Sequence, residues 1–462
     1  MIKKYDIITI GSGGGSKITS PAASMGHKAA VIEKDKLGGT CLNRGCIPSK
    51  MLIHPADVAI AIKEARKFDI HNDPNFTVDF AKLVTRISQT VDGDSDKIAA
   101  SYSKHPNITY IKGEAKFIND KTIEVNGEQM TAPKIFIAVG TRPHIPEIPG
   151  LAGTPYMTST EALRSTTLPK SMIVLGTGYI ATELGHAYGA LGTKTIFLVR
   201  STMLRNEDAQ IAEEFTRVFA QHHDMRFGAV PTKVEYANGQ FTVHYTQNGQ
   251  AQHVSAEALL VATGIASNAD TLNLKSTNIR VNDKGYIVTD DFLKTSVDDV
   301  YALGDCIGRY FFRHSVNFEG EYLFNTLFAG AAKRPIQYPP VPHAIFAHPQ
   351  VAGVGKTEEQ LKAEGVDYVV GLNPYKSSAM GMALLCDYGF CKLLIERSSR
   401  RILGCHIVGV EASDMIHMVI AFMNTNGTLD DLLNMIYIHP ALPEIVRNTA
   451  RKAEAKFTSL GF

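Results

Sequence analysis

The chain contains the same local pattern twice: an apolar strand, a glycine-rich turn, a helix and a second apolar strand. The first copy spans residues 5–33 with the turn GSGGGS at 11–16, and the second spans residues 171–200 with the turn GTGYIA at 176–181. In such a βαβ unit, glycine lets the backbone approach a pyrophosphate at the N-terminus of the helix. One glycine turn alone is weak support, but two in the same context predict two dinucleotide-binding domains.

Each copy supplies candidate ligands. In the first copy Gly11 and Gly13 form the turn, and Glu33 ends the second strand, where a carboxylate can accept a hydrogen bond from a ribose hydroxyl. Ser16 stands in place of the third glycine, so we expect looser packing of the helix on the strand. An ordinary tight strand-to-helix turn is the alternative. The corresponding residues of the second copy are Gly176, Gly178 and Ala181.

Length and composition are those of a globular protein of about three domains, at roughly 150 residues each. The 462 residues are 44% hydrophobic and 20% charged, with 47 Lys and Arg against 46 Asp and Glu. This charge balance gives no reason to expect a nucleic-acid or anionic-membrane partner. No apolar run reaches the roughly 18 residues of a membrane span, and the start MIKKYDIITIGSGGG lacks the apolar core of a secretion signal. We therefore expect a cytoplasmic protein.

Proline-rich segments at 143–149 and 335–342 indicate domain boundaries. Beyond the second segment, strands expected at 368–371, 390–395 and 401–408 are followed by helical stretches. The predicted fold class is α/β, with two three-layer, Rossmann-like nucleotide-binding domains and a C-terminal α+β domain. The predicted segments are 1–148 and 269–335 for the first domain, 149–268 for the second and 340–462 for the third.

Two of the six cysteines, Cys41 and Cys46, lie five residues apart in the segment GGTCLNRGCIPSK at 38–50. In a reducing cytosol a close pair indicates redox chemistry or a metal. At the start of a helix the two sulfurs could meet as a redox-active disulfide. Two buried thiols are one alternative, and half of a zinc site is another, although no second ligand pair at the usual spacing is present. The cysteines at 386, 391 and 405 are expected to behave as small apolar residues.

The cysteine segment, the two glycine turns and the sequence HPALPE at 439–444 together resemble the class I pyridine nucleotide–disulfide oxidoreductases. This family includes dihydrolipoamide dehydrogenase, glutathione reductase, mycothione reductase and mercuric reductase. The resemblance extends over essentially the whole chain. It implies FAD in the first βαβ unit, a nicotinamide nucleotide in the second, and a C-terminal domain that forms a homodimer.

The resemblance also implies contacts to FAD. The segment YALGD at 301–305 places Asp305 on the ribitol, with a helix N-cap before Cys306 as the alternative role. Ala115 matches a backbone contact to the adenine, and Thr40 matches a position near the pyrophosphate. The segments AVG and ATG, which end at Gly140 and Gly264, match the returns from the β-meanders to the nucleotide-binding sheets.

In the implied reaction, hydride passes from the nicotinamide to FAD, and electrons pass to the Cys41–Cys46 disulfide and on to a substrate disulfide. Cys46 is implied to be the thiolate on the flavin side, and Cys41 the thiol that attacks the substrate. Because a free thiol with a pKa of about 8.5 is mostly protonated at neutral pH, a base is needed. His439 of the partner subunit, oriented by Glu444, matches the family's base.

Three further residues match family positions beside the flavin. Lys50 and Glu183 match an ion pair, and Tyr179 matches a gate that shields the flavin until the nucleotide arrives, with a packing aromatic as its alternative role. Arg44, between the cysteines, could favour a thiolate, attract an acidic substrate or simply face solvent in a turn. His54, Arg313 and His314 are candidate contributors to the substrate cleft, with core or rim roles as the alternative.

The nucleotide is predicted to be NADPH rather than NADH. Family members that use NADH place a carboxylate at the end of the second nucleotide-binding strand, whereas this chain has Arg200 there and Arg205 soon after. Two guanidinium groups suit a 2′-phosphate, and two ordinary surface arginines are the alternative. Ile265 departs from the family pattern, which commonly has arginine after the glycine at 264, so one cofactor contact is expected to be missing.

The predicted substrate is a low-molecular-weight disulfide, as in glutathione and mycothione reductases, with a role in cell redox homeostasis. The HPALPEIV segment is most similar to mycothione reductase, whereas CLNRGCIPSK is closer to dihydrolipoamide dehydrogenase, which with NAD is the second hypothesis. The absence of a cysteine pair at 456–462 argues against mercuric reductase and large thioredoxin reductases. Metal-ion or quinone reduction is a side-activity hypothesis, and a flavin-binding subunit without turnover is the hypothesis from another class.

Overall fold

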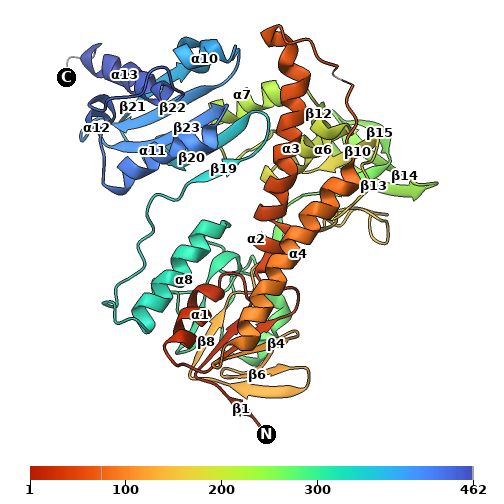
Figure 1. Cartoon of the computed structure of the whole chain (residues 1–462), viewed down its shortest axis with the longest axis vertical. Helices are drawn as coiled ribbons and strands as arrows, with labels where there is room; N and C mark the ends of the chain where they lie inside the picture. Colours follow the sequence, from red (N-terminus) through yellow and green to blue (C-terminus); the bar gives the residue numbers. More distant parts are fainter. Residues whose placement is uncertain (74, 460–462) are drawn as a thin grey trace. The chain divides into compact units, whose positions relative to one another are not determined.

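The computed structural model describes residues 1–73 and 75–459, and it divides into two compact units (Figure 1). Two of the boundaries between the units, after His144 and after Gln337, fall inside the proline-rich segments. Of the segment 456–462, which contains no cysteine, the last three residues lie outside the described residues. Unit 1 comprises Met1–Ser49, Lys82–His144 and Gly264–Gln337, and unit 2 comprises Lys50–Ala81, Ile145–Thr263 and Tyr338–Phe462.

Unit 1 is built on a five-stranded parallel sheet in the order β18-β8-β2-β3-β4. The central strand is apolar and buried along its whole length, as expected for a parallel strand covered on both faces. The strands are β2 (Ile7–Ile10), β3 (Ala29–Glu33), β4 (Ile108–Lys112), β8 (Lys134–Ile137) and β18 (Val300–Ala302).

Helices and two smaller sheets complete unit 1. Helices α1 and α8 pack against each other beside the parallel sheet (Figure 1). A four-stranded sheet has the order β1-β7-β6-β5, and β9 pairs with β17. The helices are α1 (Ser16–Ser24), α2 (Gly39–Arg44), α4 (Phe80–Lys104) and α8 (Arg313–Leu327), and the strands are β1 (Lys3–Lys4), β5 (Lys116–Asn119), β6 (Thr122–Val125), β7 (Glu128–Thr131), β9 (Thr141–Pro143) and β17 (Ile265–Ser267).

The first part of unit 2 repeats this arrangement. Its parallel sheet has the order β12-β11-β10-β16, which is the order of β4-β3-β2-β8 in unit 1. A three-stranded antiparallel sheet, β13-β14-β15, precedes β16 in the chain. The elements are α3 (Cys46–Glu64), α5 (Ser159–Ala162), β10 (Ser171–Leu175), α6 (Tyr179–Leu191), β11 (Lys194–Val199), α7 (Ala209–Phe219), β12 (Asp224–Phe227), β13 (Ala229–Ala237), β14 (Gln240–Gln247), β15 (Gln250–Ala256) and β16 (Ala258–Val261).

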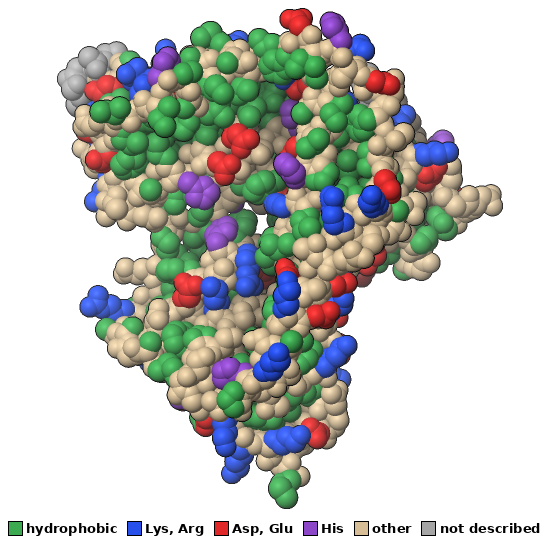
Figure 2. All heavy atoms as spheres, viewed as in Figure 1, with side chains coloured by type: hydrophobic (Ala, Val, Ile, Leu, Met, Phe, Trp, Pro, Cys, Tyr) green, Lys and Arg blue, Asp and Glu red, His purple; other side chains and the backbone are tan. Residues whose placement is uncertain are grey.

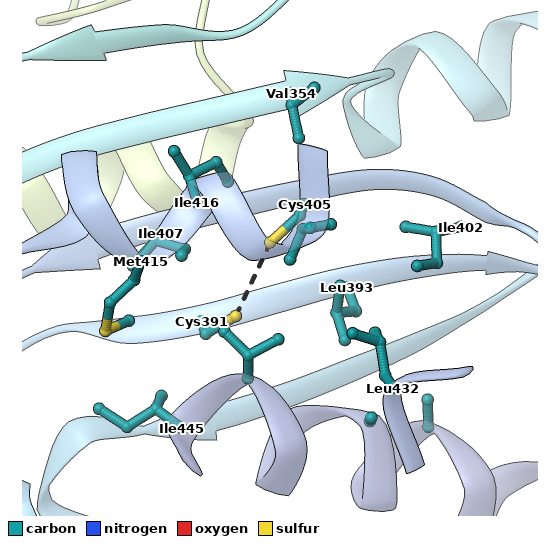
Figure 3. Packing of buried hydrophobic residues seen from close by; sticks show 14 of the residues in the cluster. Val354, Cys391, Leu393, Ile402, Cys405, Ile407, Met415, Ile416, Leu432 and Ile445 are labelled. Carbon is teal, nitrogen blue, oxygen red and sulfur yellow. Dashed lines mark hydrogen bonds between the residues drawn. The ribbon is translucent and has the colours of Figure 1, made fainter. Parts of the chain in front are cut away.

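The C-terminal part of unit 2 is an antiparallel sheet in the order β19-β20-β23-β22-β21, with helices packed on it. Figure 3 shows the apolar core, in which the thiols of Cys391 and Cys405 approach to 3.9 Å on neighbouring strands. The elements are β19 (His343–Ile345), β20 (Gln350–Gly355), α9 (Glu358–Glu364), β21 (Tyr368–Pro374), α10 (Ala379–Ala383), β22 (Phe390–Glu396), β23 (Ile402–Gly409), α11 (Ala412–Asn424), α12 (Leu429–Leu433) and α13 (Glu444–Ser459).

The fold class is the predicted one: two α/β nucleotide-binding sheets and a C-terminal α+β domain. Both basic and acidic side chains are scattered over the face shown in Figure 2, in keeping with the near-zero net charge. Among the described residues, no helix is both long and apolar enough to cross a bilayer. The exact limits of the four predicted domain segments remain a prediction.

Candidate functional site

The two glycine turns have the same geometry. Gly11 has φ +97°, and a Cβ built on it would lie 2.2 Å from the carbonyl oxygen of Ala138. Gly176 has φ +133°, and its Cβ would lie 2.2 Å from the carbonyl oxygen of Ala262. Both positions therefore require glycine on two grounds, backbone conformation and space. The segments AVG (138–140) and ATG (262–264), which are similar in sequence, thus contact equivalent glycine turns.

The packing of α1 differs from the expectation for Ser16. The close approach of this helix to the sheet occurs one residue earlier, because a Cβ at Gly15 would lie 2.2 Å from Cγ2 of Thr9. The Ser16 hydroxyl instead donates to the carbonyl oxygen of Gly13 at 2.8 Å. The turn is thus tightened by Ser16, and the expected loosening is not found.

Glu33 holds the first turn through Ser12. Both the backbone N–H and the hydroxyl of Ser12 donate to Oε2 of Glu33, at 3.0 and 2.9 Å. The N–H of Gly38 in turn donates to the Ser12 hydroxyl at 3.0 Å. Oε2 thus accepts two hydrogen bonds, and Oε1 accepts one from the N–H of Asp35 at 3.1 Å. One lone pair of Oε1 remains to accept from a ribose hydroxyl.

The helix that carries the first cysteine begins beside the first glycine turn. A Cβ at Gly39 would lie 2.7 Å from the Cα of Gly13, so the two backbones are in contact. This contact fixes the start of α2, where Thr40 is exposed and Cys41 is half-buried. A dinucleotide that bound at the turn would therefore extend toward both residues.

Cys41 and Cys46 lie on two helices separated by Gly45, since α2 ends before this glycine and α3 begins directly after it. Both cysteines are free thiols, and a hydrogen bond joins them. This bond is the largest cause of a raised pKa at Cys41, and burial adds to the effect. The nearby charge of Arg313 acts in the opposite direction and lowers the pKa. The balance of these influences favours the protonated thiol at Cys41.

Arg44 is engaged within unit 1. Its guanidinium donates to Oδ2 of Asp35 at 2.7 Å, which links the end of α2 to the loop after β3. The neighbouring amide of Asn43 is buried and donates to the carbonyl oxygens of Lys36, Leu37 and Gly39, at 3.2, 3.0 and 3.0 Å. Arg44 and Asn43 thus hold the cysteine segment in place. The sequence alone did not indicate this role for either residue.

Asp305 lies inside a short 3₁₀ helix, η4 (Gly304–Ile307), rather than before it. Its Oδ2 accepts a hydrogen bond from Thr141 at 3.0 Å, and burial raises the pKa of its carboxyl group. Gly140 precedes this threonine with φ +63°. Ala115 is buried in the loop between β4 and β5. The close turn at Gly11, the carboxylate of Glu33 and the carboxyl of Asp305 together are compatible with a flavin dinucleotide.

In unit 2 the segment after β11 folds back onto the second glycine turn. The backbone N–H of Leu204 donates to the carbonyl oxygen of Thr177 at 2.9 Å. Arg200 and Arg205 flank this contact and are exposed. Arg205 also lines a cavity of about 810 Å³, which Arg200 does not reach. Ala181 is fully buried and packs against Gly176, where its Cβ would lie 3.4 Å from a Cβ on that glycine.

Lys50 and Glu183 form the predicted ion pair. The Lys50 ammonium lies 2.8 and 2.7 Å from the two carboxylate oxygens, and 4.3 Å from the centre of the Phe346 ring. The N–H of Phe346 also donates to Glu183 at 3.1 Å. Burial raises the pKa of Glu183, and Lys50 opposes that rise. Lys50 lies four residues after Cys46 in the same helix α3, and Tyr179 begins α6 with its ring 42% exposed.

His439 and Glu444 are joined as the sequence predicts. Nδ1 of His439 lies 3.1 and 3.0 Å from the carboxylate oxygens, and the ring is 69% exposed while the carboxylate beneath it is buried. Burial favours a higher pKa for Glu444, but hydrogen bonds from Ala441 and His439 and the charge of Arg447 bring the pKa below its usual range.

Arg447 donates to Glu444 at 2.6 Å and was missed by sequence reasoning. The sequence did contain a signal for this contact. Glu444 and Arg447 are three residues apart on one helix, and side chains at this spacing meet. The exposed imidazole, the buried carboxylate and the guanidinium form one hydrogen-bonded group, an arrangement suited to proton transfer.

Comparison with known proteins gives the family. A model of the pyridine nucleotide-disulphide oxidoreductases matches residues 5–320, and the model of the dimerisation domain of the same family matches residues 341–450. The chain belongs to this family. It is a flavoprotein disulfide reductase, and membership implies FAD, a pyridine nucleotide and a homodimer.

Several kinds of reductase are similar to this one. A mycothione reductase of Mycobacterium tuberculosis is 34% identical and aligns with 97% of this chain and 99% of its own length. A dihydrolipoyl dehydrogenase of Bacillus subtilis is 32% identical, with coverages of 97% and 96%. A mercuric reductase of Staphylococcus aureus is 33% identical, with coverages of 93% and 78%.

The solved structures include the HOCl-induced flavoprotein disulfide reductase RclA of Escherichia coli in a Cu(II) complex. It has a TM-score of 0.87 and 28% identity, and covers 97% of this reductase and 99% of its own chain. These similarities agree on the class of reaction and differ in the named substrate.

Proposed function

We propose that this flavoprotein is a cytoplasmic, NADPH-dependent reductase of a low-molecular-weight disulfide of the glutathione or mycothione type. The observation that carries the coenzyme part is the return of the segment 200–205 onto the second glycine turn, through the contact of Leu204 with Thr177. This return keeps Arg200 and Arg205 beside the turn that would bind the pyrophosphate. Two guanidinium groups there favour a 2′-phosphate, which a carboxylate would repel.

The residues that fit FAD are Gly11, Gly13, Glu33, Thr40, Ala115, Gly140 and Asp305. When bound, FAD and NADPH supply the electrons that keep Cys41 and Cys46 reduced. Lys50 supplies a positive charge, and Glu183 holds the Lys50 ammonium in one orientation. Glu183 is itself held by the N–H of Phe346. These residues bind and orient, and the disulfide chemistry falls to the two thiols and the histidine.

The raised pKa of Cys41 sets the order of proton movements. The partner subunit's His439 removes the Cys41 proton, and the thiolate attacks one sulfur of the substrate disulfide. A mixed disulfide forms, the substrate S–S bond breaks, and the leaving thiolate takes the proton from the imidazolium. The partner subunit's His439 next removes the proton of Cys46, and the Cys46 thiolate attacks the Cys41 sulfur. The bond between Cys41 and the substrate sulfur breaks, the Cys41–Cys46 disulfide forms, and the second leaving thiolate takes the proton from the imidazolium. Glu444 and Arg447 hold the imidazole in one orientation throughout.

The coenzyme proposal is tested by steady-state kinetics with NADPH and NADH. Loss of a hydrogen bond to a charged group costs about 1.5–3 kcal/mol. The variants Arg200→Gln and Arg205→Gln should therefore each lower kcat/KM for NADPH by roughly 10- to 100-fold and leave the value for NADH nearly unchanged. Arg217→Gln is the matched control, because Arg217 lines the same cavity as Arg205 but is bonded to Glu214. Equal effects on both nucleotides would contradict the proposal.

Dihydrolipoamide oxidation with NAD is the second candidate, favoured by the 32% identity to the dihydrolipoyl dehydrogenase over 96% of that protein. The two hypotheses differ in the direction of electron flow. Rapid NADH production from dihydrolipoamide, together with slow NADPH oxidation by glutathione-type disulfides, would make it the function. NADPH oxidation supported only by metal ions or quinones would instead favour reduction at the bare flavin.

A further inference from the structure

Two histidines and a glutamate meet in unit 2, away from the residues assigned above. Glu64 ends α3, His222 lies in the turn after α7, and His348 lies between β19 and β20. One ligand atom from each side chain lies within 4.8 Å of the other two. Three segments that are distant in the sequence thus bring two imidazoles and one carboxylate to one place.

One ligand-to-ligand distance matches that around a tetrahedral ion, and the other two are within 4.8 Å. With bonds of about 2.0–2.2 Å to nitrogen and oxygen, two ligands of a tetrahedral zinc ion lie about 3.3–3.5 Å apart. Nε2 of His348 lies 3.3 Å from Oε1 of Glu64. This nitrogen is buried, and its contact with the carboxylate has ion-pair distance without good hydrogen-bond geometry.

The surroundings leave one carboxylate oxygen available and hold the rings in place. Lys67 donates to Oε2 of Glu64 at 2.7 Å, so Oε1 is the oxygen that faces the histidines. The His222 and His348 rings meet edge to face at 5.4 Å and 77°. Tyr388 packs against the other side of His348 at 5.6 Å and 72°. Because His222 is exposed, a fourth position would be open to water.

We propose that Glu64, His222 and His348 form a binding site for a divalent transition cation of the zinc type. Two neutral imidazoles and one carboxylate are the ligand set that zinc accepts with a water in the fourth position. The site joins the end of α3, the end of α7 and the turn before β20, so a bound ion would cross-link the nucleotide-binding sheet and the C-terminal sheet of unit 2. The proposal is independent of the nucleotide and the substrate disulfide.

The test is a zinc titration of the FAD-containing dimer, followed by calorimetry and by the metal content after dialysis. Cys41 and Cys46 are first alkylated with iodoacetamide, because thiolates also bind zinc. The unaltered chain should bind one Zn²⁺ per subunit at this site and show a higher Tm with zinc, since a ligand of the folded state stabilises it. His222→Ala and Glu64→Gln should each weaken binding at least tenfold and abolish the rise in Tm.

His244→Ala is the matched control. Nε2 of His244 also lies 3.3 Å from a carboxylate oxygen, that of Glu235, but this pair is not part of a three-ligand group among the described residues. The control should bind zinc as the unaltered chain does. Flavin absorbance and Tm without zinc confirm that each variant folds. Zinc binding that persists unchanged in both His222→Ala and Glu64→Gln, or no binding by the unaltered chain at micromolar zinc, would overturn the proposal.

Discussion

At the scale of single residues, the Cys41 thiol is placed between opposing influences. The hydrogen bond to Cys46 and burial raise its pKa, and the charge of Arg313 lowers it. Replacing Arg313 by Gln removes the lowering influence, so the pKa of Cys41 should rise further. Because the thiolate is the reactive form, the rate of alkylation of Cys41 at pH 7 should fall by tenfold for each unit of rise. The pH profile of iodoacetamide labelling of the reduced enzyme measures this shift.

Arg313 also lies close to the first glycine turn, where its Nη1 is 3.7 Å from the position of a Cβ on Gly13. The variant could therefore lose flavin as well as reactivity. Arg313→Lys separates the two effects, because it keeps the charge and should keep the labelling profile close to that of the unaltered enzyme. An unchanged profile in Arg313→Gln would show that the charge does not act on Cys41.

At the scale of elements, substitutions in the two glycine turns should have independent effects on cofactor binding. A methyl group at Gly11 would meet a backbone carbonyl in unit 1, and one at Gly176 would meet a carbonyl in unit 2. We expect Gly11→Ala to be purified without FAD, and Gly176→Ala to retain FAD but to need a much higher NADPH concentration for reduction. Flavin absorbance and the KM for NADPH measure the two results.

Gly93 provides the control for these variants. It lies inside helix α4, and no atom lies within 4 Å of the position of its Cβ. Gly93→Ala should leave FAD and NADPH binding unchanged and raise the free energy of unfolding by up to about 1 kcal/mol, because alanine favours the helix. Loss of FAD in Gly176→Ala as well would contradict the independence of the two turns.

A buried ion cluster connects three elements of unit 2. Lys392 on β22 is fully buried and lies 2.9 and 2.8 Å from the oxygens of Asp208, which caps α7, and 2.6 Å from Glu358 at the start of α9. Burial favours a higher pKa for Glu358, but hydrogen bonds from Lys392 and Lys362 outweigh it and lower the pKa to about 2. Lys392→Met leaves Asp208 buried without its partner and should cost about 3–5 kcal/mol.

The lowered pKa of Glu358 also predicts a pH dependence. A group with a depressed pKa stabilises the fold above its unfolded value, which is about 4.3, and this stabilisation is lost as the pH falls toward 2. Glu358→Gln should therefore be less stable than the unaltered chain at pH 7, and the difference should shrink between pH 4.5 and 3. Thermal unfolding of the unaltered chain and of Glu358→Gln across this pH range measures the difference in stability, with Glu359→Gln as the control variant. A difference that stays constant would contradict the assignment.

The sequence was sufficient to predict the features that depend on local patterns. The second copy of the repeat, predicted at 171–200, does contain two strands, β10 and β11, joined by a helix. His439 meets Glu444 as expected, because the two residues are close in the chain. Contacts between distant residues were not predictable from one sequence. Thr141 with Asp305, and Lys392 with Asp208, are brought together by sheet order, and no local signal marks such pairs.

At the scale of the whole molecule, dimer formation should be required for disulfide reduction but not for reduction of the flavin. Hydrophobic side chains gather over the C-terminal domain (Figure 2), and Ile436 and Ile438, beside His439, are 99% and 82% exposed. The double variant Ile436→Asp, Ile438→Asp should be a 50.4 kDa monomer in sedimentation velocity. It should still be reduced by NADPH, and its disulfide turnover should fall by roughly 10²–10⁴-fold, because the base would come from the partner.

Val281→Asp is the control for this variant, since Val281 is an exposed apolar residue of unit 1. It should remain a dimer with full activity. A monomer with undiminished disulfide turnover would show that His439 acts within its own subunit or does not act as the base.

The central claim is that electrons from NADPH reach the Cys41–Cys46 pair. The most direct measurement is an anaerobic titration of the oxidised, FAD-containing enzyme with NADPH and, separately, with NADH, followed by absorbance. We predict rapid reduction by NADPH with a long-wavelength band from the Cys46 thiolate beside the flavin, and no such band in Cys46→Ser. A preference for NADH would contradict the assignment of Arg200 and Arg205, and bleaching of the flavin without the band would contradict the role of the two cysteines.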